Sequence, residues 1–133
     1  AICYELSDGN SLVNTINQGA EWILSIANLD PYPLSLQRQF IALAQLRSIE
    51  TSREVLIASN TGPTALITNK GEVKPILPPF IEGLGLVEVN LYKGLTGYSK
   101  FKELPLLIFM IIGFVNLNPF RRLNNSSSKN YFP

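Results

Sequence analysis

The chain has 133 residues, of which 46% are hydrophobic and only 16% are charged, and its formal net charge is +1. This length is enough for one small domain, and the near-neutral charge argues against a nucleic-acid-binding protein, which needs a basic surface. One cysteine and no histidine exclude an intrachain disulfide, a multi-cysteine zinc site and a Cys–His dyad formed within this chain. We expect no metal and no cofactor.

The only cysteine, Cys3, lies where a strand is expected to turn into a helix. Ala1 and Ile2 suit the end of a strand, and the polar run 7–18 is compatible with a helix. Free N–H groups and the dipole at a helix N-terminus stabilise a thiolate, so a cysteine in this position is a candidate nucleophile. The alternative is a small buried hydrophobe, which is common for a lone cysteine.

Helix and strand patterns alternate along residues 7–91, which predicts an α/β domain. The strand that ends at Cys3, the short helix and the strand at 22–28 follow one another in the order of a βαβ unit, so these two strands are expected to be parallel. Turn residues at 69–71 indicate a hairpin between two later strands. In chain order, the expected elements are a short helix ending at Gly19, a strand at 22–28, a helix at 34–52, and strands at 54–59, 64–68, 72–76 and 86–89.

An apolar segment at 104–120 follows. Pro105 suits a first helical turn, and the uninterrupted apolar run covers about 12 residues, against roughly 20 for a normal membrane span. A buried core helix is therefore an alternative to a membrane helix. The basic pair Arg121-Arg122 favours a membrane helix whose C-terminal end faces the cytoplasm, because basic residues flanking a span stay on that side.

Four stretches carry a resemblance to a known family. They are Ile2–Glu5, Asn60–Ala65, Gly94–Tyr98 and the apolar segment near the end, in this order. The first resembles the nucleophile elbow of the nitrilase (carbon–nitrogen hydrolase) superfamily. The ordered set resembles the apolipoprotein N-acyltransferases, bacterial membrane enzymes that add the last acyl chain to lipoproteins. The resemblance covers most of the chain, from Ala1 to about Phe120.

The resemblance implies a fold, a reaction and a location. The fold is α/β, the second half of an αββα nitrilase-type sandwich (1–98), followed by a membrane-proximal link and one C-terminal transmembrane helix (99–122) and a polar cytoplasmic tail (123–133). The reaction moves a fatty acyl chain from a phospholipid, through a thioester on Cys3, to the N-terminal amine of an apolipoprotein. The implied location is the bacterial inner membrane, with the catalytic part on the periplasmic side.

The resemblance also assigns catalytic roles. Nitrilase-type enzymes use a Glu–Lys–Cys triad, in which the Cys attacks a carbonyl, the Glu handles the proton and the Lys stabilises the oxyanion. Cys3 matches the nucleophile, and Glu5 matches an acid that is tied to activity in the family. The triad Glu and Lys precede the Cys in the family and have no match here, so we expect the missing N-terminal half of the same enzyme as a partner. Its lysine is expected near Cys3, because Glu5 alone would favour the neutral thiol. The family also shows the pair Arg47 and Glu50, which we interpret as a structural ion pair along the long helix.

Substrate-binding positions are also carried over from the family. Its loop after the first strand holds an Asn-Asp pair and a Trp-Phe pair, which Asn28, Asp30 and Tyr32 match only loosely. Gly62 in the Asn-Thr-Gly turn would let the backbone approach a bound acyl group. Tyr4 is either a wall of the acyl pocket or a core residue, and the core is favoured. The candidate substrate-binding residues are Tyr4, Asp30, Tyr32, Asn60 and Gly62.

Two other interpretations stay open. The chain could be a soluble nitrilase-type amidase in which 104–120 is a core helix. It could also be inert alone, a C-terminal piece that needs a separate N-terminal half, since half a sandwich leaves a sheet edge and an apolar face uncovered. We expect the isolated chain to be in this incomplete state.

Overall fold

The computed structural model describes residues 1–117, which divide into two units, one from Ala1 to Lys100 and one that begins at Phe101. The first unit is built on a sheet with the strand order β1-β2-β3-β4. The strands are β1 (Ile23–Ala27), β2 (Val55–Ser59), β3 (Thr64–Ile67) and β4 (Val73–Leu77). β1 and β2 are parallel, and the other neighbouring pairs are antiparallel. The α/β fold class expected from the sequence is confirmed, and the parallel pairing expected between the segment before Cys3 and the strand at 22–28 is present as a single bridge between Ile2 and Ile26.

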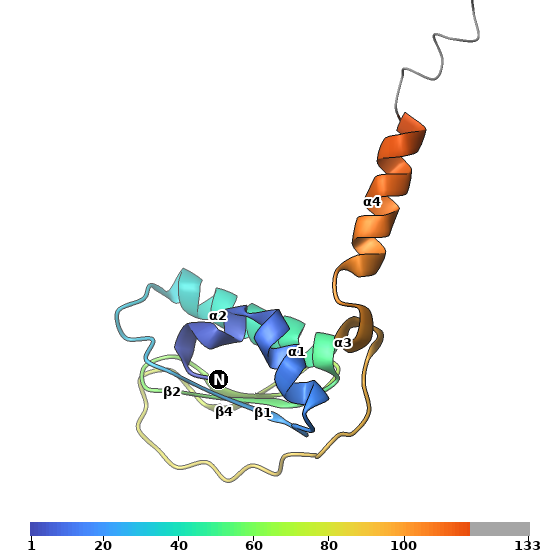
Figure 1. Cartoon of the computed structure of the whole chain (residues 1–133). Helices are drawn as coiled ribbons and strands as arrows, with labels where there is room; N and C mark the ends of the chain where they lie inside the picture. The colour runs from blue at the N-terminus through green and yellow to red at the C-terminus, as the bar shows by residue number, and fades with distance from the viewer. Residues whose placement is uncertain (118–133) are drawn as a thin grey trace, which may run out of the picture. The chain divides into compact units, whose positions relative to one another are not determined.

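Two helices lie on the same face of this sheet (Figure 1). They are α1 (Gly9–Asn17) and α2 (Leu34–Thr51), and α2 makes the crossover between β1 and β2. α1 is followed by Gly19 in a left-handed conformation (φ 106°), which is the C-terminal glycine that the sequence predicts. The core between helices and sheet is formed by Leu6, Leu12, Ile16, Ile23, Ala44, Val55, Ile57, Ala65 and Ile67.

The other face of the sheet carries apolar side chains that are exposed. Ile23 and Ser25 of β1 point into the core and are 5% and 0% exposed, whereas the alternate residues Leu24 and Ile26 are 41% and 46% exposed. Successive side chains of a strand point to opposite faces. A strand with apolar residues on both faces is typical of a sheet that is covered on both sides.

The prediction of a strand at 86–89 is wrong, because residues 78–96 contain no helix or strand. Hydrogen bonds to side chains of the domain fix this segment, although it forms no strand. The carboxylate of Glu54, which is 2% exposed, accepts hydrogen bonds from the backbone N–H of Asn90 (2.7 Å) and from its Nδ2 (3.0 Å). Arg53 donates to the carbonyls of Ala20 (3.0 Å) and Gly94 (2.8 Å). Burial lowers the pKa of Arg53, and the negative charge of Glu21 partly opposes this.

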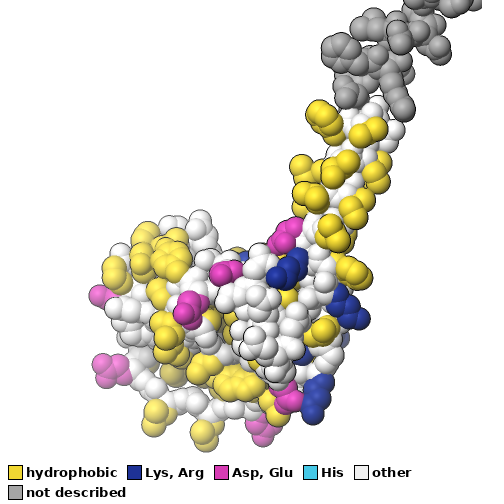
Figure 2. Space-filling model, viewed as in Figure 1, with side chains coloured by type: hydrophobic (Ala, Val, Ile, Leu, Met, Phe, Trp, Pro, Cys, Tyr) yellow, Lys and Arg dark blue, Asp and Glu magenta, His cyan; other side chains and the backbone are white. Residues whose placement is uncertain are grey.

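Two helices follow. The short α3 (Gly97–Phe101) forms where the sequence indicates only a link, and α4 (Leu104–Leu117) has Pro105 in its first turn as expected. Figure 2 shows apolar side chains along the visible face of α4. The transmembrane helix expected in this region is not supported, since no helix within residues 1–117 is both long and apolar enough to cross a membrane. The pair Arg121-Arg122 and the predicted tail lie outside the described residues.

Candidate active site

Cys3 lies at a sharp backbone turn at one end of the sheet. Ile2 forms a parallel bridge with Ile26 of β1, and the chain then turns directly into a short 3-10 helix, η1 (Cys3–Ser7). Cys3 has a φ of 51°, a left-handed conformation that non-glycine residues seldom adopt and that is concentrated at functional sites. This strand-like entry, strained residue and helical exit have the geometry of a nucleophile elbow. The expected turn at Cys3 is confirmed, and the thiol is half-buried.

Glu5 closes this turn by a reciprocal pair of hydrogen bonds. The Ile2 N–H donates to Oε2 of Glu5 (2.7 Å), and the Glu5 N–H donates to the Ile2 carbonyl (3.1 Å). The first bond is one half of a capping box, in which the side chain three residues into a helix satisfies the free N–H at its start, and Ile2 has no side-chain acceptor for the other half. The contacts of Glu5 in this structure therefore fix the backbone on either side of Cys3.

An apolar pocket of about 160 Å³ opens beside Cys3. The rings of Tyr4 and Tyr32 meet edge to face at its border, with centroids 6.3 Å apart. Tyr4 is 61% exposed, so the interpretation of Tyr4 as a core residue is wrong. The pocket is lined by Cys3, Tyr4, Leu29, Tyr32, Leu36, Gln39, Phe40 and Leu43.

The other candidate residues lie behind this pocket or beside it. Asn60 Oδ1 accepts from the Leu29 N–H (3.0 Å), and a Cβ on Gly62 would lie 2.5 Å from Leu29 Cδ1. Both residues therefore shape the pocket through Leu29, which is 3% exposed. Asp30 is exposed, is not among the lining residues, and donates its N–H to Asn28 Oδ1 (3.1 Å). The structure brings Cys3, Tyr4 and Tyr32 together at this pocket, and it leaves Glu5 and Asp30 outside the lining.

Five residues of α2 line or support the pocket and were not singled out from the sequence as site residues, namely Leu36, Gln37, Gln39, Phe40 and Leu43. Leu36, Phe40 and Leu43 recur at helical spacing, which is also typical of a helix face that packs on a core, and all three line the pocket. Gln37 is 3% exposed and donates through Nε2 to the carbonyls of Leu29 (3.3 Å) and Tyr32 (3.2 Å). A buried glutamine inside an apolar helix face is the signal that could have indicated this support of the loop.

Within the described part of the chain, no three His, Cys, Asp or Glu side chains lie close enough together to hold a metal ion. The site that residues 1–117 do build combines a thiol, an apolar pocket and two tyrosine rings. A thiol nucleophile next to an apolar pocket is suited to forming a thioester with an apolar acyl group.

The chain is similar to curated apolipoprotein N-acyltransferases, while no family model matches it. It is 56% identical over 112 residues to the protein of that name from Prochlorococcus marinus, covering 84% of this chain and 23% of the relative. The protein of that name from Parasynechococcus marenigrum is 57% identical over 100 residues (75% of this chain, 22% of the relative). The one from Wigglesworthia glossinidia brevipalpis is 37% identical over 116 residues (86% and 23%). The resemblance recognised in the motifs is confirmed, and the chain spans about a quarter of the length of these relatives.

Proposed function

We propose that this chain, which matches one segment of the apolipoprotein N-acyltransferases, is part of such an enzyme and supplies its nucleophile, Cys3. The observation that supports this most directly is the position of the thiol. Cys3 lies at a left-handed turn between a strand-like segment and a helical turn, and it borders an apolar pocket. The similarity to enzymes of that name over most of the chain favours the same reaction.

The proposed reaction has two steps. In the first, the Cys3 sulfur attacks the ester carbonyl of a phospholipid, the ester C–O bond breaks, and the thiol proton passes through a base to the departing alcohol of the lysophospholipid. In the second, the free α-amino group of a lipid-modified N-terminal cysteine attacks the thioester, the C–S bond breaks, and an amine proton returns to the Cys3 sulfur. An ester is thereby exchanged for an amide, and no oxidant or reductant is needed.

The base and the oxyanion donor of this reaction are proposed to come from the rest of the enzyme. The chain has no histidine, and Glu5 is engaged with the Ile2 N–H. We assign Glu5 to holding the turn, and the proton transfer to a glutamate outside this chain. A lysine from the same part would stabilise the oxyanion.

The pocket favours an acyl donor over the polar amide that a soluble amidase would take. Leu36, Phe40 and Leu43 give it an apolar wall, and burial of a fatty acyl chain contributes about 0.8 kcal/mol for each CH₂ removed from water. Tyr4 and Tyr32 at the border present ring faces and edges to the substrate.

We further propose that the enzyme works on the outer face of the bacterial inner membrane and that α4 contacts the bilayer. The large apolar side chains of α4 are between 49% (Ile108) and 75% (Phe109) exposed. Exposed apolar surface of this extent is typical of membrane or protein contact.

The test uses a chimera in which this chain replaces the matching segment of the Prochlorococcus marinus relative, called the chimera below. Membranes with the chimera are incubated with a phospholipid and a synthetic diacylated lipopeptide, and the lipopeptide mass is measured. We expect an increase of one acyl group at the N-terminal amine, absent with Cys3→Ala. A folded chimera that leaves the lipopeptide mass unchanged, while the unaltered relative acylates it, would overturn the proposed function.

A further inference from the structure

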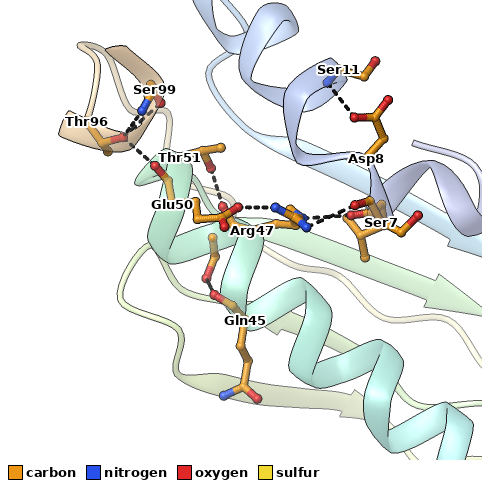
Figure 3. A network of polar contacts seen from close by, with 11 residues as sticks. Ser7, Asp8, Ser11, Gln45, Arg47, Glu50, Thr51, Thr96 and Ser99 are labelled. Carbon is orange, nitrogen blue, oxygen red and sulfur yellow. Dashed lines mark hydrogen bonds and ion pairs between the residues drawn. The ribbon is translucent and has the colours of Figure 1, made fainter. Parts of the chain in front are cut away.

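The guanidinium of Arg47 is buried at the end of the turn that carries Cys3. Arg47 is 8% exposed and all three of its side-chain nitrogens have partners. Nε donates to the Leu6 carbonyl (3.0 Å), Nη2 donates to the Ser7 carbonyl (3.1 Å), and Nη1 pairs with the carboxylate of Glu50. Figure 3 shows Arg47 reaching from α2 to Ser7, with Glu50 on its other side. The ion pair predicted from the sequence is confirmed, but the larger contact is with the backbone of η1.

These two carbonyls are groups that the short helix cannot satisfy by itself. The last carbonyls of a helix have no partner within it, and a cation at that end also interacts favourably with the helix dipole. Arg47 meets both needs at the C-terminal end of η1, just as the Glu5 carboxylate meets them at the N-terminal end through the Ile2 N–H. A planar guanidinium holds two neighbouring carbonyls in a fixed geometry, which a lysine ammonium cannot reproduce.

The backbone around Arg47 is shaped to admit it. A Cβ added to Gly9 would lie 2.2 Å from Arg47 Nη1 and 2.9 Å from Cζ, so the guanidinium packs directly against the backbone at the start of α1. Asp8 caps α1 by accepting from the Ser11 N–H (3.1 Å). The exit from η1 is therefore fixed from both α1 and α2.

Arg47 does not line the pocket and reaches Cys3 only through the backbone of η1. Cys3 has a φ of 51°, and such a conformation persists only where the surrounding structure holds it. The turn has two anchors, Glu5 at its start and Arg47 at its end. Removal of either anchor lets the turn relax and moves the sulfur relative to the pocket.

We propose that Arg47 is a positioning residue for the nucleophile. It holds Cys3 in its attacking orientation by donating hydrogen bonds to the Leu6 and Ser7 carbonyls. The connection continues beyond Arg47. The Thr96 hydroxyl donates to the backbone carbonyl of Glu50 and accepts from the Ser99 N–H (2.9 Å). The same network thus joins the turn of Cys3 to the start of α3. This inference rests on the proposed function, because it assigns Arg47 to the acylation of Cys3.

The experiment measures single-turnover acylation of the chimera by a labelled phospholipid. For Arg47→Lys we expect the rate constant to fall about 10- to 100-fold, the scale on which small misplacement of a reacting group acts. The amplitude and the donor concentration at half-maximal rate should stay as in the unsubstituted chimera. A variant that is merely less stable would instead lose amplitude and keep its rate constant. Arg38→Lys, an exposed position on the same helix, is the matched control and should react normally.

The outcomes separate the two proposals. Acylation of Arg47→Lys at the normal rate, in a chimera that does form the thioester, would overturn the role of Arg47 and leave the proposed function standing. If the unsubstituted chimera forms no thioester, the proposed function fails, and amide hydrogen exchange decides on Arg47. Exchange at Glu5 and Asp8, whose N–H groups bond within η1, should then be faster in Arg47→Lys with β2 unchanged, and equal exchange would overturn the inference.

Discussion

Gly9 is the residue at which the space for Arg47 can be tested without touching any charged group. In Gly9→Ala the new methyl overlaps the guanidinium, and the guanidinium cannot move aside without losing its bonds to Leu6 and Ser7. Overpacking of this kind costs about 1–3 kcal/mol. We expect slower acylation of the chimera and a lower thermal midpoint. Gly97→Ala, where nothing lies within 4 Å of the added Cβ, is the control, and equal behaviour of the two variants would contradict the close packing.

A second prediction concerns Leu36, which lines the apolar pocket beside Cys3. In Leu36→Trp the larger side chain fills part of the pocket beside Cys3, so a long acyl chain should no longer fit. We expect long-chain phospholipids to acylate the chimera at least 10-fold more slowly, with alkylation of Cys3 by iodoacetamide unchanged. Leu46→Trp on the same helix, which does not line the pocket, controls for added bulk. Normal acylation of Leu36→Trp would exclude this pocket as the acyl site.

The sequence predicted the local structure around some single residues and not around others. The turn at Cys3 was predictable, because a strand pattern and a helix pattern meet there. The exposure of Tyr4 was not, since an aromatic residue next to a strand packs inward as readily as outward and only the position of η1 decides. The contact between Gly62 and Leu29 was also beyond the sequence, because it depends on how two loops 31 residues apart meet, as the bond from Leu29 to Asn60 shows.

At the level of elements, the segment 78–96 is fixed by hydrogen bonds to a buried carboxylate and not by pairing with a strand. Asn90 provides two donors to the carboxylate of Glu54, and hydrogen bonds to charged groups contribute about 1.5–3 kcal/mol. In Asn90→Ala one of these bonds is lost, and we expect faster limited proteolysis of the chimera within 83–93. Glu88→Ala, an exposed position of the same segment, should be cleaved like the parent. Equal cleavage of both variants would mean that Glu54 does not hold the segment.

The same segment explains where the prediction of elements failed. Helices α1 and α2 and strands β1 to β4 were expected from apolar runs, helical spacing and turn residues, and they lie within a few residues of their expected ends. The alternation at 86–89 is of the same kind, but in the described part of the chain no strand pairs with it. Alternation indicates which residues could form a strand. Whether a partner strand lies beside them depends on the tertiary structure, which the local sequence does not reveal.

The face of the sheet on which apolar side chains are exposed leads to a prediction about the molecule as a whole. We propose that Leu24 and Ile26, both exposed, pack against the other half of the sandwich in the complete enzyme. The double variant Leu24→Lys, Ile26→Lys should therefore fail to co-purify with the rest of the Prochlorococcus marinus relative expressed as a separate chain. Burial of an unpaired lysine is strongly unfavourable. Leu34→Lys with Leu46→Lys, two exposed positions on α2, should still co-purify, and retention of the sheet variant would contradict a sandwich.

The measurement that tests the central claim most directly is the trapping of an acyl group on Cys3. The chimera in membranes is incubated with a phospholipid that carries an alkyne-tagged acyl chain, and the labelled protein is digested and analysed by mass spectrometry. The account predicts an acyl adduct on the peptide that contains Cys3, released by neutral hydroxylamine as a thioester is and absent from Cys3→Ala. Label that persists in Cys3→Ala, or a folded, membrane-bound chimera without label while the unaltered relative is labelled, would contradict the claim that Cys3 is the acyl-carrying nucleophile.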